Sequence, residues 1–145
     1  MTRFSMAAAL LAAAAASGAL AQTSPPSGRE LLLKTTSEFE WKPSTNLPPG
    51  AEYQLVREDP VTRGIEAVVR FPSGYAVPAH AHDVDETIVV LKGKLALTAG
   101  AAAERVLKPF DYAAIPAGLR HEMRVKGFGA CWMLVTTSGP YNVRR

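Results

Sequence analysis

The chain has 145 residues, about the size of one ordinary domain, and its 20% charged and 48% hydrophobic side chains are typical of a globular protein. The formal net charge is only +3, and the basic residues are scattered without forming a Lys/Arg-rich stripe, so we expect no nucleic-acid partner. A single cysteine excludes an intramolecular disulfide, so the fold must depend on its apolar core.

The first 21 residues are predicted to be a secretory signal peptide. Arg3 supplies a positive start, an apolar run of 11 residues extends from Met6 to Ala16, and Ala19-Leu20-Ala21 forms an A-x-A cleavage site. The run is well short of the roughly 20 residues that a helix needs to cross a bilayer. The alternative is an Ala-rich helix of the fold, but the segment lacks a polar face. We therefore expect a periplasmic or secreted protein that starts near Gln22 and has no membrane contact after cleavage.

The rest of the chain is predicted to divide into an N-terminal arm with an irregular connection, residues 22–49, and a β-domain, residues 50–145. The arm opens with a Pro/Ser-rich stretch, and three prolines and a glycine lie between Trp41 and Gly50. Within the arm, Arg29 to Thr36 is the one stretch that can form a strand.

From Glu52 onward the sequence consists of short strands and turns. Ile65 to Phe71 alternates with a period of two, and the β-branched run Thr87 to Leu91 is followed by Lys94 to Thr98 as its expected hairpin partner. Because no segment after residue 30 has a sustained helical period, the predicted fold class is all-β, a sandwich or a barrel. Further strands are expected at Glu52–Arg57, Glu104–Leu107, Tyr112–Ile115, Arg120–Val125 and Ala130–Thr137, the last of which should bury Cys131 as a core thiol.

All the histidines of the chain belong to one predicted cluster. His80 and His82 are two apart, so on a strand both imidazoles point to the same face. Glu86 follows across a short bend, and His121 lies on a separate strand after a Pro-Ala-Gly turn. Neutral imidazoles and one carboxylate suit a borderline divalent ion such as Fe, Mn, Zn, Ni or Cu. The spacing alone also allows ordinary hydrogen-bonded histidines on the surface or in the core.

Two segments resemble the motifs of the cupin superfamily. Gly74 to Gly93 (GYAVPAHAHDVDETIVVLKG) is similar to the first motif, G-x5-H-x-H-x3-E-x6-G, at every defined position. Phe110 to Val125 (FDYAAIPAGLRHEMRV) resembles the second motif, G-x5-P-x-G-x2-H-x3-N, with Phe110 in place of glycine and Val125 in place of asparagine. Neither departure affects a metal ligand.

The resemblance, which covers about residues 50 to 137, implies a single-domain, jelly-roll-like β-barrel with the metal inside, similar to small exported cupins. The metal ligands of the family correspond to His80, His82, Glu86 and His121. If His121 faces inward, Met123 and Val125 share its face. Other side chains have weaker claims to the site. Asp83 and Asp85 can orient a ligand histidine or be solvated turn residues, and Tyr75, Tyr112 and Trp132 can line the pocket or pack in the core.

Three functions remain open from the sequence. The first is a metalloenzyme of the oxygenase or decarboxylase kind that acts on a small organic molecule, with Glu86 as a catalytic proton acceptor. The second is a non-catalytic module outside the cytoplasm that binds a metal or a small ligand. The third, with the least support, is a purely structural barrel. A homodimer is compatible with each of these functions.

Overall fold

Two antiparallel sheets make up the described part of the chain, which is residues 31–145 of this computed structural model. The predicted signal peptide and its cleavage site lie outside the described residues. Within them, the predicted all-β class is confirmed, since the α-helical state is absent and a short 3-10 turn, Thr36–Glu38, is the sole helical element described. No helix in this range is long and apolar enough to span a membrane.

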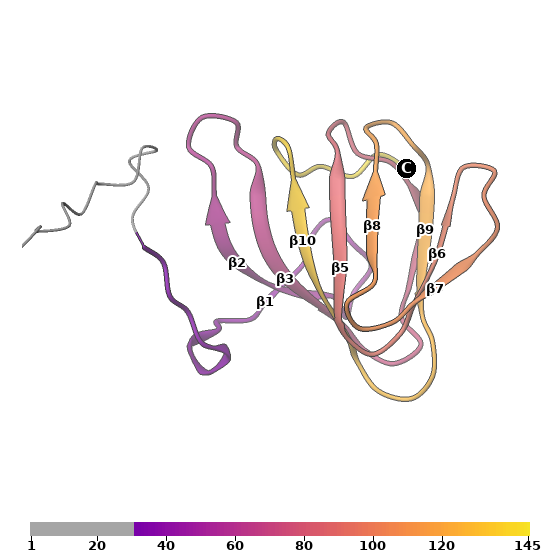
Figure 1. Ribbon diagram of the computed structural model, residues 1–145, viewed down its shortest axis with the longest axis horizontal. Coiled ribbons are helices and arrows are strands. Elements are labelled where there is room, and N and C mark those ends of the chain that lie inside the picture. The colour runs from indigo at the N-terminus through magenta and orange to yellow at the C-terminus, as the bar shows by residue number, and fades with distance from the viewer. Residues whose placement is uncertain (1–30) are drawn as a thin grey trace, which may run out of the picture. The chain divides into compact units, whose positions relative to one another are not determined.

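The larger sheet has six strands in the order β1-β2-β3-β10-β5-β8. Figure 1 shows β2, β3, β10, β5 and β8 side by side in this sequence. The strands that are neighbours here come from distant parts of the chain, because β10 inserts between β3 and β5. Their bounds are β1 (Lys42–Pro43), β2 (Glu52–Glu58), β3 (Ile65–Phe71), β5 (Glu86–Lys92), β8 (Tyr112–Ile115) and β10 (Cys131–Thr137).

The smaller sheet has four strands in the order β4-β9-β6-β7. Its β9 strand lies between β4 and β6, so every residue of β9 has a neighbour on at least one side. The bounds are β4 (Ala76–His80), β6 (Leu95–Ala99), β7 (Arg105–Leu107) and β9 (His121–Val125).

The core lies between the inner faces of the two sheets. Alternation with a period of two places Cys131, Met133 and Val135 of β10 inward, and His121, Met123 and Val125 of β9 likewise. The buried cluster joins both sheets, with Phe71, Ile88, Val90 and Met133 from the larger sheet and Val77, Leu95, Leu97 and Met123 from the smaller one. The expected burial of Cys131 is confirmed, because its exposed fraction is 0%.

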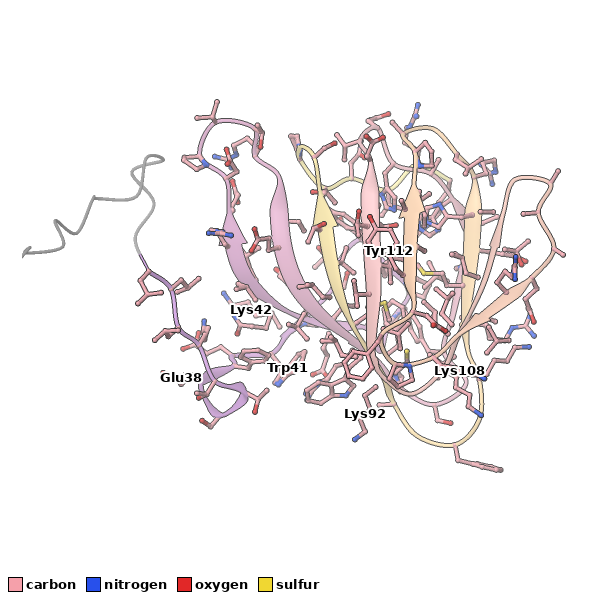
Figure 2. The ribbon with its side chains drawn as sticks, viewed as in Figure 1. Glu38, Trp41, Lys42, Lys92, Lys108 and Tyr112 are labelled. Carbon is pink, nitrogen blue, oxygen red and sulfur yellow. The ribbon has the colours of Figure 1, made fainter. Side chains whose placement is uncertain are left out.

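An aromatic cluster covers part of the outer face of the larger sheet. The ring of Trp41 packs edge-on against Trp132, with ring centroids 5.1 Å apart, and the Arg70 guanidinium lies 4.0 Å from the centre of the Trp41 ring. Lys92 lies over the Trp132 ring, and Figure 2 shows Trp41 and Lys92 at the same end of the sheet. Segment 39–43 therefore shields an outer face that would otherwise expose Trp132.

The expected strand in the arm and the expected burial of Tyr112 were wrong, whereas the core position expected as one alternative for Tyr75 is confirmed. Residues 31–35 form no strand, and the chain enters the 3-10 turn at Thr36, so the described part of Arg29–Thr36 is irregular. Tyr112 is 61% exposed and lies on the outer face of β8 (Figure 2). Tyr75 is a core residue, with an exposed fraction of 8% and its hydroxyl bonded to the carbonyl of Pro48.

Candidate metal centre

The four predicted ligands lie where β4, β5 and β9 meet. His80 is the last residue of β4 and His121 is the first residue of β9, and the two are directly paired across these strands. Glu86 is the first residue of β5 in the other sheet, and His82 lies in the short connection between β4 and β5. The chain therefore crosses from one sheet to the other within the first motif, and both sheets contribute a ligand.

The turn of the second motif holds this connection in place. The backbone N–H of Gly118 donates to the carbonyl of His82 at 2.8 Å, and the N–H of Ala117 donates to the Asp85 carboxylate at 2.9 Å. Gly118 has a φ of +77°, a left-handed conformation that glycine adopts without strain. The glycine of the Pro-Ala-Gly turn thus places the N–H groups that fix the ligand segment, and Asp85 serves this turn, without contact to a ligand ring.

The three imidazole rings converge on one point. One ring nitrogen from each of His80, His82 and His121 lies within 4.8 Å of the other two. Glu86 joins them from the opposite sheet, with its Oε2 atom 3.4 Å from the Nε2 atoms of both His82 and His121. Glu86 is not part of the mutually close group of three, so it contacts one side of the histidine cluster. All four side chains are buried.

Backbone carbonyls fix which nitrogen of each ring carries the proton. The Nδ1 atoms of His80 and His121 contact the carbonyls of Pro78 and Leu119 at 2.8 and 3.0 Å, in each case the residue two before the histidine. The Nδ1 atom of His82 contacts the carbonyl of Asn142, 60 residues away in sequence. Because a carbonyl only accepts, Nδ1 must donate in all three rings. Each neutral ring therefore directs an unprotonated Nε2 lone pair into the cluster.

These inward atoms have no hydrogen-bond partner among the described residues. The set comprises Nε2 of the three histidines and Oε2 of Glu86, each with almost no exposed surface. Buried polar atoms are normally satisfied, and four acceptors that face one another repel. A divalent cation would satisfy all four at once, and imidazole nitrogen with carboxylate oxygen is a donor set that such ions prefer. The residues present therefore fit a metal ion.

The protonation states also suit a metal. Burial lowers the pKa of His80 to about 4, so this ring is neutral at neutral pH. Burial would raise the pKa of Glu86, but the adjacent imidazoles of His121 and His82 outweigh it and lower the pKa to about 2. Burial likewise acts to lower the pKa of His82, yet the Glu86 carboxylate raises it above the ordinary value overall. A proton is therefore expected to compete with the ion at His82 in particular.

A cavity of about 330 Å³ adjoins the cluster, with Glu86 in its wall. The inner face of the larger sheet supplies most of the wall, and Met123 supplies part of it from the smaller sheet. Pro140, Tyr141 and residues 44–47 also line it. Apart from Glu86, the charged residues that line it are Glu58 and Arg63, which pair with each other at 2.6 Å. None of Tyr75, Tyr112 and Trp132 lines this cavity.

The segment after β10 contributes to the site, and no sequence motif predicted this contribution. Tyr141 lies against His82 with ring centroids 5.0 Å apart, and the Asn142 carbonyl accepts from His82. Asp83 contacts the side chains of Asn142 and Arg144, so it holds this segment beside His82. In the sequence, Tyr141 and Asn142 belong to no periodic pattern and no motif. Sequence patterns therefore do not distinguish this segment from an ordinary C-terminal tail.

Comparisons with known proteins agree with this geometry. Residues 67–137 match the family model described as a cupin domain, and they contain both ligand motifs. In fold, the chain is similar to the polyketide cyclase RemF from Streptomyces resistomycificus, with a TM-score of 0.67 and 16% identity over 80% of this chain and 85% of that one. The chain belongs to the cupin superfamily.

Two further relatives of this cupin differ in what they cover. An oxalate oxidase structure is similar with a TM-score of 0.61 and 20% identity, over 82% of this chain and 65% of that one. The DNA damage-repair/toleration protein DRT102 of Arabidopsis thaliana is 34% identical over 99 residues, which is 68% of this chain. The cupin spans only 30% of the length of that relative. The solved structures are under 25% identical, so they establish the fold alone.

The two departures from the second cupin motif have different structural outcomes. Phe110 keeps a left-handed backbone with a φ of +73°, the conformation that glycine adopts freely, and its side chain is 86% exposed. Val125 is 3% exposed and packs in the core. The first departure therefore adds local strain, whereas the second replaces a polar group by an apolar one at a buried site.

Proposed function

We propose that this cupin is a metal-dependent enzyme that acts on a small organic molecule, with one divalent ion held by His80, His82, Glu86 and His121. One observation carries the proposal: four buried acceptor atoms without hydrogen-bond partners converge beside a cavity that Glu86 lines. A structural barrel has no need of either feature. A buried acceptor without a hydrogen-bond partner costs about 1–3 kcal/mol of folding free energy. A bound cation would remove this cost for the four acceptors together.

The cavity indicates the size and character of the molecule. Its volume of about 330 Å³ is at the lower end of the range for small-molecule sites. The wall is largely apolar, which favours a ligand with an apolar body. The apolar lining residues are Leu47, Leu55, Ile65, Ala67, Val69, Phe71, Ile88, Met123, Met133, Val135 and Pro140.

Glu86 has two properties that a reaction at this place needs. It belongs to the metal cluster through Oε2 and it lines the cavity, so its carboxylate reaches both the ion site and a bound molecule. Its low pKa keeps it ionised, and an ionised carboxylate can accept a proton from that molecule. When bound, a divalent ion would polarise an oxygen atom of a coordinated substrate. These properties support a reaction of the oxygenase or decarboxylase kind.

A non-catalytic binding module is the second candidate, and one observation favours it. Among the described residues that line the cavity, Glu58 and Arg63 neutralise each other, and no lysine or non-ligand histidine is present. Acid–base chemistry would thus rest on Glu86 and on tyrosine hydroxyls. A protein of this kind would bind its ligand tightly and release it unchanged.

The deciding experiment combines metal analysis with turnover. We expect the purified protein to hold one divalent ion per chain, and His82→Ala to lose it. A panel of small phenols and keto acids, followed by oxygen consumption and product formation, should give a signal in the wild type and none in His82→Ala. Ligand binding without turnover would favour the module. A metal-free protein whose stability is unaffected by a chelator would contradict both candidates.

We also propose that the protein is exported, because of its predicted signal peptide. N-terminal sequencing of the protein isolated from the periplasm or the medium tests this. A chain that starts at Gln22 supports export, whereas a chain that retains Met1 in the cytoplasm contradicts it.

A further inference from the structure

Residues 139–145, which we call the closing segment, are bound directly to the segment that carries the ligands. The backbones of Ala81 and Arg144 exchange two hydrogen bonds, at 2.8 and 2.9 Å. The Asp83 N–H donates to the side-chain oxygen of Asn142 at 2.9 Å, and Arg144 pairs with the Asp83 carboxylate at 2.7 Å. These contacts lie on both sides of His82, so the position of the closing segment relative to His82 is fixed.

This attachment places Tyr141 between His82 and the cavity. Its ring lies at 36° to the His82 ring with a centroid distance of 5.0 Å, and it lines the cavity together with Glu86. Among residues 31–145, no hydrogen bond is found for the Tyr141 hydroxyl, in contrast to the hydroxyl of Tyr75, which donates to the Pro48 carbonyl. The phenol of Tyr141 is thus an unused donor in the wall of the cavity.

The metal site itself offers a ligand no hydrogen-bond donor. The inward atoms of the three histidines and of Glu86 are acceptors that would bind the ion. Three neutral imidazoles and one carboxylate around a divalent ion leave one positive charge in an apolar cavity, and an anionic ligand would neutralise it. A tyrosine hydroxyl is protonated at neutral pH and can donate to an oxygen of that anion.

We propose that Tyr141 is a ligand-binding residue, whose hydroxyl donates a hydrogen bond to an anionic oxygen of the molecule that binds at the metal site. The inference rests on the proposed function, and it adds the chemical class of the ligand. That class is a small monoanion, such as a carboxylate or an enolate, on an apolar body. Tyr141 selects it over neutral metal ligands that offer no acceptor.

The test uses the cobalt(II) form, because the visible absorption of cobalt reports ligand binding without any turnover. Tyr141→Phe keeps the ring against His82 and removes only the hydroxyl. Tyr53→Phe is the matched control, since Tyr53 also lines the cavity but lies on β2, separated from β5 by β3 and β10. The probes are acetohydroxamate, an anionic oxygen ligand, and imidazole, a neutral nitrogen ligand.

We expect all three proteins to bind one equivalent of cobalt with equal affinity. Tyr141→Phe should bind acetohydroxamate roughly 10- to 100-fold more weakly than the wild type, because a hydrogen bond to a charged group is lost. Its affinity for imidazole should be unchanged, and Tyr53→Phe should match the wild type with both probes.

Two results would overturn the role of Tyr141 while leaving the metal site intact. One is an unchanged acetohydroxamate affinity in Tyr141→Phe, and the other is an equal loss of imidazole affinity, which would indicate altered packing. If the wild type binds no cobalt, the proposed metal site fails, and the role of Tyr141 fails with it. Cobalt stoichiometry, measured first, distinguishes this failure from the other two.

Discussion

Phe110 and Phe128 can each be replaced by glycine and by alanine, and we expect the glycine variant to be the more stable at residue 110 and the alanine variant at residue 128. Both side chains lie in turns and are largely exposed, at 86% and 109%. Phe110 has a φ of +73°, whereas Phe128 is not among the residues with positive φ. At either site the glycine and alanine variants lose the same ring, so their difference reports the backbone alone.

The magnitudes follow from the two conformations. A left-handed backbone costs a residue with a Cβ atom roughly 1–2 kcal/mol, and glycine avoids this cost. Glycine also has a more flexible unfolded state, which costs about 0.4–1 kcal/mol relative to alanine. We therefore expect Phe110→Gly to be more stable than Phe110→Ala by about 0.5–1 kcal/mol. At Phe128, where strain is absent, alanine should be the more stable by about 0.4–1 kcal/mol.

Urea unfolding of the four variants at one pH and one metal concentration measures these differences. The slope of the unfolding free energy against urea should be the same in all four, so the midpoints can be compared directly. If alanine is at least as stable as glycine at residue 110, the left-handed strain does not exist. The family glycine at this point of the second motif would then need another explanation.

Three further predictions concern the site and the core. Asn142→Ala loses the side-chain contacts that position the carbonyl bonded to His82, so the metal affinity should fall about 10-fold in a metal titration. Arg57→Ala is the control, because it breaks only an exposed ion pair and should leave the metal affinity unchanged. In the metal-free protein, His80 has a pKa of about 4 when folded and 6.5 when unfolded, so its contribution to stability should decline as the pH falls from about 6.5 to about 4, by up to about 1.4 kcal/mol per pH unit. Urea unfolding at pH 7 and pH 5 should show a smaller loss in His80→Asn than in the wild type, and an equal loss would contradict the assignment. Cys131 is fully buried and burial raises its pKa to about 11, so it should react with a thiol reagent only after denaturation, and stoichiometric labelling of the folded protein would contradict this.

The strands and the convergence of the ligands could be predicted because both follow local rules. The alternation in Ile65–Phe71 predicted β3 to the residue, since side chains on a strand point alternately to the two faces. The apolar stretch in Ala130–Thr137 predicted β10 to within one residue. The placement of Met123 and Val125 on the face of His121 follows from the same rule and is confirmed. His80 and His121 come together as the motifs implied.

The closing segment could not be predicted, because its role depends on contacts between residues far apart in sequence. Nothing near Asn142 indicates that its carbonyl accepts from His82, 60 residues earlier. The same reason explains Trp132, which was considered for the pocket. Its alternation places it on the outer face, and only the distant Trp41 packs against it there. Sequence patterns specify which face a residue occupies, and tertiary contacts specify what covers that face.

The direct pairing of His80 with His121 has a consequence for when an ion can be loaded. In the unfolded chain only His80, His82 and Glu86 are close in sequence, and two imidazoles and a carboxylate on a flexible segment hold an ion weakly. The third ring arrives when β4 and β9 pair, and this non-local step must first overcome loop-closure entropy and comes slowly. The barrel should therefore assemble empty and take up its ion afterwards, so the ion that it acquires is set by the supply in the compartment where it folds.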